Sequence, residues 1–197
     1  MRRGDPPGMS GTDFCVDLPS WAIGRERVGE RFANDEARMR FAIALARGNV
    51  DHGTGGPFGA ALFERETGRL VAVGVNSVVR LANSALHAEM VAFMRAQTRL
   101  RSYTLAAPGL PAVELHSSCD PCAMCLGAVL WSGVSRLVCA ATRDDATALT
   151  FDEGPVFPES YDYLERRGVR VDRGFLRQEA VVVLEAYRRQ GGVIYNR

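Results

Sequence analysis

The chain contains no lysine: all 24 basic residues in its 197 positions are arginine. This absence excludes chemistry that forms a Schiff base on a lysine amine, and it excludes a P-loop, which needs a lysine for phosphate. An excess of one charge is missing too, because 23 acidic residues bring the net charge to +1. Nucleic-acid and anionic-membrane binders usually carry a clear positive excess. We therefore expect a small-molecule partner, and neither a nucleic acid nor a membrane.

Long hydrophobic runs are also missing. Stretches such as Ala180–Leu184 are among the longest, and they fall far short of the roughly 20 residues that span a bilayer. Residues 1–14 contain Gly, Pro, Asp and Ser where a signal peptide would have a continuous apolar core. We therefore expect a cytoplasmic protein without a transmembrane helix.

Cysteine is scarce and unevenly placed. There are five cysteines, an odd number, and those at 119, 122 and 125 lie close together. A chain of this length buries enough surface to fold without disulfide bonds. The cysteines therefore favour a metal site or a catalytic thiolate over a disulfide framework.

The order of hydrophobic patterns predicts an α/β fold. Residues 1–30 are rich in Gly, Pro and charge without a sustained period, so we expect a flexible or loosely docked extension before one domain over 31–197. After an initial strand hairpin, helical and strand patterns alternate, which predicts three α/β/α layers around a mixed five-stranded sheet. The predicted helices cover 35–48, 86–101, 161–167 and 175–189, with another opening at Asp120 and Pro121, and the predicted strands cover 58–63, 70–75, 113–116, 136–140 and 169–171.

Two short motifs carry the chemistry. His87-Ala88-Glu89 and Pro121-Cys122-Ala123-Met124-Cys125 together form the H-x-E and P-C-x-x-C signature of zinc-dependent deaminases. Two cysteines three apart at a helix start place both sulfurs on one face, where the helix dipole favours thiolates. With His87 they make three ligands, which leaves one position of Zn²⁺ open, as in catalytic sites. Glu89 can then lie beside the metal and transfer protons, so the motifs predict hydrolytic deamination of an amino-substituted heterocycle.

Other interpretations of the cysteines need to be considered. A C-x-x-C pair is also found in redox sites, and Cys119 or His116 could complete a closed, structural four-ligand zinc site. The protein would then be a non-catalytic, zinc-stabilised binding module. Neither alternative accounts for an H-x-E sequence that opens a helix of its own.

Three stretches resemble bacterial guanine deaminases, a branch of the cytidine-deaminase-like superfamily. They are Gly55-Gly56-Pro57-Phe58-Gly59-Ala60, the segment 118–128 around the cysteines, and Trp131 shortly after it. The resemblance covers most of residues 35–197. It implies conversion of guanine to xanthine and ammonia, a Zn²⁺ cofactor and a homodimer. It also implies substrate contacts from Phe58, Asn76, Trp131, Asp145 and Tyr195, with Asp145 accepting hydrogen bonds from the purine and Tyr195 covering the site.

The sequence also departs from that family's pattern. Asn83-Ser84-Ala85-Leu86 precedes the histidine, Asp120 replaces a common glutamate, and His116 replaces a common tyrosine. These differences leave the substrate open. A pterin, an aminotriazine, cytosine or a modified purine, as the substrate of a biosynthetic deaminase, would use the same zinc chemistry, and transfer RNA adenosine is a further alternative.

Overall fold

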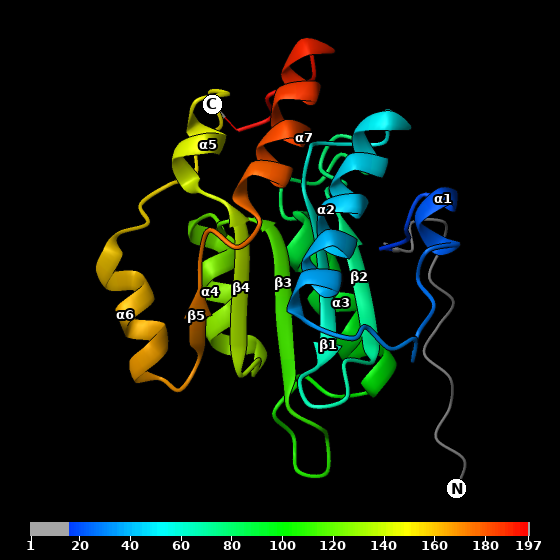
Figure 1. The fold of residues 1–197 in the computed structure, drawn as a ribbon, viewed down its shortest axis with the longest axis vertical. Helices are drawn as coiled ribbons and strands as arrows, with labels where there is room; N and C mark the ends of the chain where they lie inside the picture. The colour runs from blue at the N-terminus through cyan, green and yellow to red at the C-terminus, as the bar shows by residue number, and fades with distance from the viewer. Residues whose placement is uncertain (1–15, 197) are drawn as a thin grey trace, which may run out of the picture.

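A single mixed sheet forms the centre of the computed structural model, which describes residues 16–196 (Figure 1). Its strand order is β2-β1-β3-β4-β5. Strand β1 is antiparallel to both of its neighbours, whereas β3, β4 and β5 run parallel to one another. The strands are β1 (Gly59–Glu64), β2 (Leu70–Val75), β3 (Val113–Cys119), β4 (Arg136–Ala141) and β5 (Arg170–Asp172).

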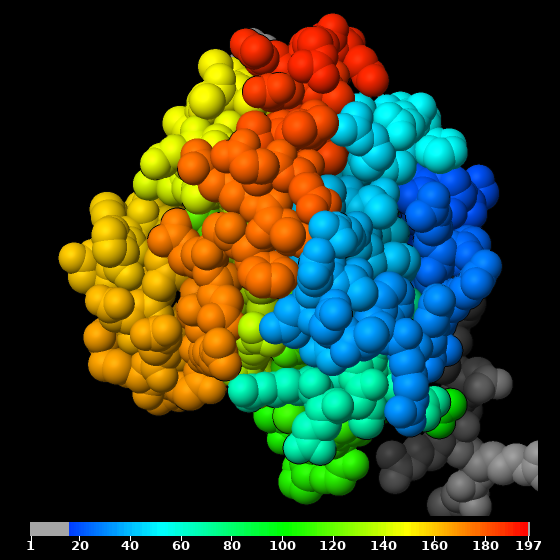
Figure 2. Space-filling model, viewed as in Figure 1, coloured from blue at the N-terminus to red at the C-terminus, as the bar shows by residue number. Residues whose placement is uncertain are grey.

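Helices cover both faces of this sheet. On one face, α2 (Asp35–Asp51) and α7 (Arg177–Arg189) lie side by side, as the space-filling view shows (Figure 2). On the other face, α3 (Ala88–Leu100) and α4 (Ala123–Ser132) share a core cluster with the inner strands. The predicted three-layer α/β/α fold is therefore confirmed, because strands β1 to β4 are buried on both faces, which requires helices on both sides of the sheet.

Short elements complete the chain: α1 (Ser20–Ile23), α5 (Arg143–Thr147) and α6 (Pro158–Arg166). The sequence patterns did not predict α1 or α5, which are too short for a helical period to be visible. Several predicted helix ends also differ. Helix α2 continues past Gly48 to Asp51, because Gly48 packs beneath the Trp21 ring and does not end the helix.

The start of α4 differs from the prediction as well. Asp120 and Pro121 were expected to open this helix, but its N-cap is Cys122. The chain is still paired with β4 at Asp120, whose N–H donates to the Ala141 carbonyl at 2.8 Å. The Asp120 carboxylate instead accepts hydrogen bonds from the Arg143 N–H at 3.1 Å and from the Arg173 side chain.

Residues 16–30 are docked on the domain, in contrast to the predicted extension over 1–30. Leu18 and Ala22 are buried, and the Trp21 indole N–H donates to Thr54 Oγ1 at 2.9 Å. Glu26 is almost fully buried between Arg95 and Arg99 of α3. Apolar contacts and a buried ion pair thus hold a segment whose composition suggested mobility. Residues 1–15 of the predicted extension lie outside the described part of the chain.

Within residues 16–196, no helix combines the length and the apolar character that a membrane crossing requires.

Candidate active site

Two helix N-termini meet at the carboxyl end of β3. His87 is the N-cap of α3 and Cys122 is the N-cap of α4, and neither side chain caps its own helix. Helix α3 can approach β2 so closely because Gly74 has no side chain: a Cβ there would lie 2.0 Å from the Ala88 carbonyl oxygen. Because neither His87 nor Cys122 caps its own helix, their side chains can face each other at the positive ends of two helix dipoles.

Three soft donor atoms converge at this point. The ligand atoms of His87, Cys122 and Cys125 all lie within 4.8 Å of one another, and Cys122 Sγ is 3.4 Å from His87 Nδ1. Cys125 is fully buried and Cys122 nearly so. One imidazole and two sulfurs are a donor set that suits Zn²⁺ and leaves a tetrahedral position free. The residues thus fit the zinc centre that the motifs predicted.

The two cysteines have different ionisation properties. Hydrogen bonds from Cys125 and from His87, together with the His87 charge, lower the pKa of the Cys122 thiol to about 4. The neighbouring sulfur of Cys122 and burial raise the pKa of Cys125 well above its ordinary value. Cys122 is therefore a thiolate at neutral pH, which is the form that binds a metal.

Glu89 lies directly beside the donor cluster. Its Oε1 accepts a hydrogen bond from Ser117 Oγ at 3.1 Å, and its Oε2 accepts one from Cys125 Sγ at 3.5 Å. Burial and the negative charge of Cys122 raise the pKa of this carboxyl. A carboxyl with a raised pKa can both take and return a proton near neutral pH.

The residues proposed for a closed zinc site do not join this cluster. Cys119 Sγ points to the Thr142 carbonyl at 3.6 Å. His116 lies on the face of β3 that is opposite to Ser117, and its Nε2 forms a hydrogen bond with Glu114 at 2.9 Å. In the described part of the chain, the donor group around His87 thus has three members, which is the number typical of catalytic zinc sites.

A small cavity adjoins the donors. Its volume is only about 10 Å³, and it is lined by Phe58, Asn76, His87, Glu89, Asp120, Cys122, Glu153 and Tyr195. Such a volume holds about one water molecule. The structure therefore brings Phe58, Asn76 and Tyr195, three of the five predicted substrate contacts, to the same place as the metal donors.

Asn76 and Tyr195 form one side of the cavity. The Asn76 side-chain amide donates to the Tyr195 hydroxyl at 2.7 Å and accepts from the Gly56 N–H at 3.2 Å. A Cβ at Gly56 would lie 2.9 Å from the Tyr195 ring, so only glycine leaves room for this ring. The ring centres of Tyr195 and His87 are 5.8 Å apart in an edge-to-face arrangement. The C-terminal tyrosine thus covers the donor cluster of its own chain.

Glu153 is a cavity residue that the sequence analysis did not identify. It lies in the connection between α5 and α6, is 8% exposed, and its backbone carbonyl accepts from the Ala123 N–H at 2.9 Å. Burial, with the nearby charges of Cys122 and Glu89, raises its pKa to about 8. No motif marks this position in the sequence. The only signal is an acidic residue in a Gly- and Pro-containing connection that follows the cysteine motif.

Asp145 and Trp131 do not line the cavity. Both Asp145 oxygens pair with Arg177 at 2.7 and 2.8 Å, and one of them also bonds the Thr142 backbone and hydroxyl. Asp145 therefore caps α5 and ties it to α7. Trp131 is 77% exposed on the outer side of α4. The expected substrate roles of these two residues have no support in this geometry, because their elements turn them away from the donors.

Comparison with known proteins agrees with this geometry. Residues 33–141, more than half of the chain, match the family described as the cytidine and deoxycytidylate deaminase zinc-binding region. The chain belongs to this family of zinc-dependent deaminases. The match includes the H-x-E and P-C-x-x-C motifs, so the donors and the neighbouring glutamate lie within the family's zinc-binding region.

Several relatives of this deaminase are guanine deaminases. It is 34% identical to guanine deaminase from Bacillus subtilis over 136 residues, which are 69% of this chain and 83% of the relative. A solved structure of guanine deaminase from Nitrosomonas europaea is 43% identical, covers 92% of this chain and 100% of its own, and has a TM-score of 0.87. A structure solved in complex with 2,6-diaminopurine is 46% identical over 92% of this chain and 96% of its own, with the same TM-score.

Proposed function

We propose that this deaminase converts guanine and water to xanthine and ammonia. The observation that carries the proposal is the small cavity in which two buried carboxyls, Glu89 and Glu153, and the amide of Asn76 lie around the donor cluster. A guanine ring presents N–H and amino groups that carboxylates can accept, and carbonyl and ring nitrogen acceptors that an amide can donate to. Guanine deaminases among the relatives support the same substrate.

His87, Cys122 and Cys125 hold the zinc ion in this proposal. Zinc supplies a Lewis acid that makes a water molecule acidic enough to act as a nucleophile near neutral pH. The low pKa of Cys122 keeps its sulfur ready for the metal. The Cys125 thiol, whose pKa is raised in the absence of a metal, loses its proton when the ion binds.

Glu89 moves the protons of the reaction. It removes a proton from the attacking water and delivers it to the ring nitrogen next to the carbon that bears the amino group. It then takes the remaining proton from the added oxygen and transfers it to the departing amino group, so that a C=O bond forms, the C–N bond breaks and ammonia leaves. Ser117 donates a hydrogen bond to one carboxyl oxygen of Glu89, so the group is oriented before the substrate arrives.

Glu153 and Asn76 recognise the base, with Glu153 taking the role that the sequence analysis assigned to Asp145. Phe58 and Tyr195 enclose the flat ring between aromatic surfaces. Phe58 is itself held edge-to-face against Phe151, with ring centres 5.1 Å apart.

The test measures ammonia release by the purified, zinc-loaded enzyme from a panel of substrates. The panel contains guanine, adenine, cytosine, a pterin, an aminotriazine and transfer RNA. We expect guanine to give the highest kcat/KM. Glu153→Gln should reduce guanine turnover about ten- to a hundredfold, since it replaces a carboxyl oxygen that can accept from the base by an amide NH2 group that cannot, and leaves the buried donor of the base unpaired. Ammonia release from another base, and not from guanine, would overturn guanine as the proposed substrate but would leave the proposed deamination reaction standing. No ammonia from any compound would overturn the function.

We further propose a homodimer that forms through α4 and α6. Met124 and Trp131 lie on one side of α4, seven residues apart, and both are exposed. Phe157 and Tyr163 are exposed next to them, around a groove of about 380 Å³ between the two helices. An exposed apolar patch of this kind is typical of a protein interface. Cytoplasmic location stays a prediction of the sequence.

A further inference from the structure

Asn49, near the end of α2, is a buried polar residue that the proposed reaction does not use. It is fully buried, and its Nδ2 donates to the Gly56 carbonyl at 2.8 Å and to the Asn76 carbonyl at 2.9 Å. Its Oδ1 accepts from the Thr54 hydroxyl at 2.7 Å. One side chain thus ties α2 to the connection before β1 and to the residue that follows β2.

The hydrogen bonds that reach Asn49 run in one direction only. The Trp21 indole nitrogen can only donate, and it donates to Thr54 Oγ1 at 2.9 Å. The Thr54 hydroxyl has a single proton, which it donates to Asn49 Oδ1. The NH2 group of Asn49 therefore faces the two backbone carbonyl oxygens. A flipped amide does not fit here, because a carbonyl oxygen cannot donate to the amide oxygen.

The same direction continues from Gly56 to Asn76. The Gly56 N–H can only donate, and Asn76 Oδ1 accepts it at 3.2 Å. The Asn76 oxygen is therefore occupied, and its NH2 group is the part that is left for the cavity, where it donates to the Tyr195 hydroxyl at 2.7 Å. The group that Asn76 offers to a base is thus a hydrogen-bond donor. A matching base presents an acceptor there, such as a carbonyl oxygen or an unprotonated ring nitrogen.

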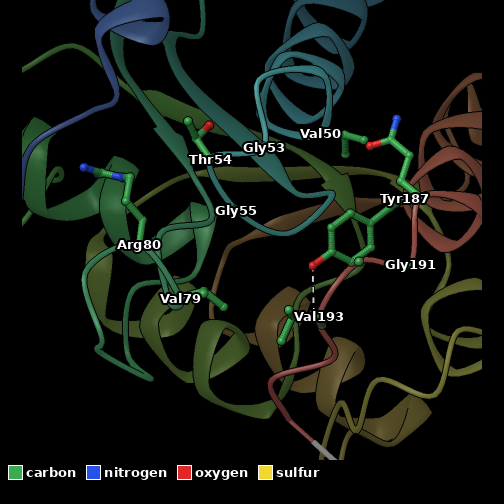
Figure 3. Close-up of a pocket in the computed structure, with 11 residues that line it drawn as sticks. Val50, Gly53, Thr54, Gly55, Val79, Arg80, Tyr187, Gly191 and Val193 are labelled. Atoms are coloured by element: carbon green, nitrogen blue, oxygen red, sulfur yellow. Dashed lines mark hydrogen bonds between the residues drawn. The ribbon is translucent and has the colours of Figure 1, made fainter.

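The turn that carries Thr54 has open space on one side. Residues 53–55 line a cavity of about 380 Å³, whose other walls include Val50, Arg80 and Tyr187 (Figure 3). Among the described residues, apart from its chain neighbours, a Cβ at Gly53 would have no atom within 4 Å. Because packing does not fix the turn on this side, its position depends on directional bonds such as the one between Thr54 and Asn49.

Trp21 anchors the other end of these bonds. Its ring stacks on His52 with ring centres 5.1 Å apart, and it lies directly against the backbone of Gly48. Trp21 belongs to α1, in the segment 16–30 that docks on the domain. The docked segment is therefore connected to the cavity through Thr54 and Asn49.

We propose that Asn49 is a positioning residue that fixes how Asn76 meets the base. Held by Thr54 and Trp21, it keeps the Asn76 amide turned so that the NH2 group faces an acceptor atom of the base. Without these bonds the Gly56 N–H moves from Asn76 Oδ1, and the Asn76 amide can turn its oxygen toward the same acceptor. The inference rests on the proposed function, because it uses the assignment of Asn76 to the base.

A pair of substitutions at Thr54 tests this role. Thr54→Val has nearly the same shape but loses the hydroxyl, whereas Thr54→Ser keeps it. We expect Thr54→Val to lower kcat/KM for guanine about two- to tenfold, the range for one lost hydrogen bond. The loss should come from a higher KM with kcat nearly unchanged, since Asn76 holds the base and does not take part in proton transfer. Thr54→Ser should retain most of the wild-type value.

A double-mutant cycle separates positioning from a general structural role. In an Asn76→Ala background, Thr54→Val should have no further effect on kcat/KM, because the amide that the bonds orient is already absent. Trp21→Phe, which keeps an aromatic ring on Gly48 but removes the indole N–H, should behave like Thr54→Val in both backgrounds. An equal fold loss from Thr54→Val in both backgrounds would overturn the proposal, and so would an unchanged kcat/KM in the single variant.

Asn49→Asp tests the positioning residue directly. It keeps the shape of the side chain but has no NH2 group for the Gly56 and Asn76 carbonyls, so kcat/KM should fall at least about tenfold. If this variant does not fold, the Thr54 pair decides the question. Zinc content and thermal unfolding of each variant confirm that the comparison is made on folded, loaded protein.

A measurement without substrate separates this inference from the proposed function. Amide hydrogen exchange at Gly56 should be about two- to tenfold faster in Thr54→Val and should return to the wild-type rate in Thr54→Ser, because the Gly56 N–H loses a fixed acceptor. Wild-type ammonia release from guanine decides the function, and the cycle is measured with another base if that base is the substrate. Unchanged exchange at Gly56 would overturn the inference even in an enzyme that deaminates guanine.

Discussion

At the scale of single residues, the site depends on titratable groups whose pKa values are shifted by burial and by neighbouring charges. Glu89 and Glu153 line one small cavity, and desolvation raises the pKa of both carboxyls. The His87 and Cys122 pair has the opposite character, since each partner favours the charged form of the other. A cavity with proton carriers on one side and metal donors on the other is suited to hydrolysis of a neutral heterocycle.

Replacing Glu89 separates proton transfer from metal binding. Glu89→Gln should keep the fold and the zinc but lower kcat at least about a hundredfold, because an amide cannot carry protons. Ser117→Ala, which removes only the hydrogen bond that orients Glu89, should cost much less. Steady-state ammonia release and metal analysis of both variants check this. Turnover near the wild-type rate in Glu89→Gln would remove this residue from the mechanism.

Replacing a cysteine tests which sulfurs hold the metal. Cys122→Ser should lose most of its zinc, because an alcohol is a far weaker ligand than a thiolate. Cys119→Ser should keep about one ion per chain, since this thiol bonds the Thr142 carbonyl away from the donors. Metal analysis after dialysis gives the result. Full zinc in Cys122→Ser, or zinc loss in Cys119→Ser, would contradict the assignment.

At the scale of elements, α5 shows how a short helix is held in place. Thr142 and Asp145 form a capping box, and the Asp145 carboxylate also pairs with Arg177 of α7. The hydrogen bonds from Arg177, and those from Thr142, lower the pKa of Asp145 to about 2. Helix α5 precedes the connection that carries Glu153, so this cap supports the site from outside.

The lowered pKa predicts how Asp145 contributes to stability. A carboxyl with a depressed pKa in the folded state stabilises it at all pH values above the unfolded pKa, and that contribution is lost as pH falls toward 2. Asp145→Asn should therefore lower the free energy of unfolding by about 1 kcal/mol after allowance for solvent screening, equally between about pH 5 and pH 8.

Urea denaturation across that pH range measures the effect, and guanine turnover of the variant should stay within about twofold of wild type at saturating zinc. A large loss of guanine specificity without a loss of stability would return Asp145 to the substrate role that the sequence suggested.

At the scale of the whole molecule, the two faces of the sheet differ in what they expose. Helices α2 and α7 cover one face and pack on each other. On the other face, α4 and α6 leave Trp131, Met124, Phe157 and Tyr163 open to solvent. The proposed dimer would bury these side chains and leave the α7 surface free.

The proposed dimer predicts that a single charged substitution at its interface should dissociate it. Trp131→Arg should convert the protein to a monomer at micromolar concentration, because it places a charge at the centre of an apolar interface. Val182→Arg on α7, where the side chain is also exposed, should leave the dimer intact. Light scattering on the wild type and both variants gives the masses. A wild-type monomer would contradict the proposed assembly.

The sequence by itself determined the fold class and identified the three residues that we propose to hold the metal. Alternating apolar patterns are local, so they placed four of the five strands within one residue of an observed strand at each end; the third, predicted over 113–116, reaches Cys119. Likewise, Glu89 lies two positions after His87, and Cys125 lies three positions after Cys122. Such spacings on a helix start decide which side chains face the same way before any packing occurs.

Only the tertiary structure decided what surrounds those donors. Glu153 comes from a connection without a period, and Asn49 bonds the carbonyl of Asn76, a residue 27 positions away. Asp145 lies on α5 and Trp131 lies on α4. Neither side chain faces the cavity, because α5 docks against α7 and Trp131 is on the outward side of α4. Side-chain direction at such positions depends on how elements pack, and packing is set by contacts between residues far apart in the chain.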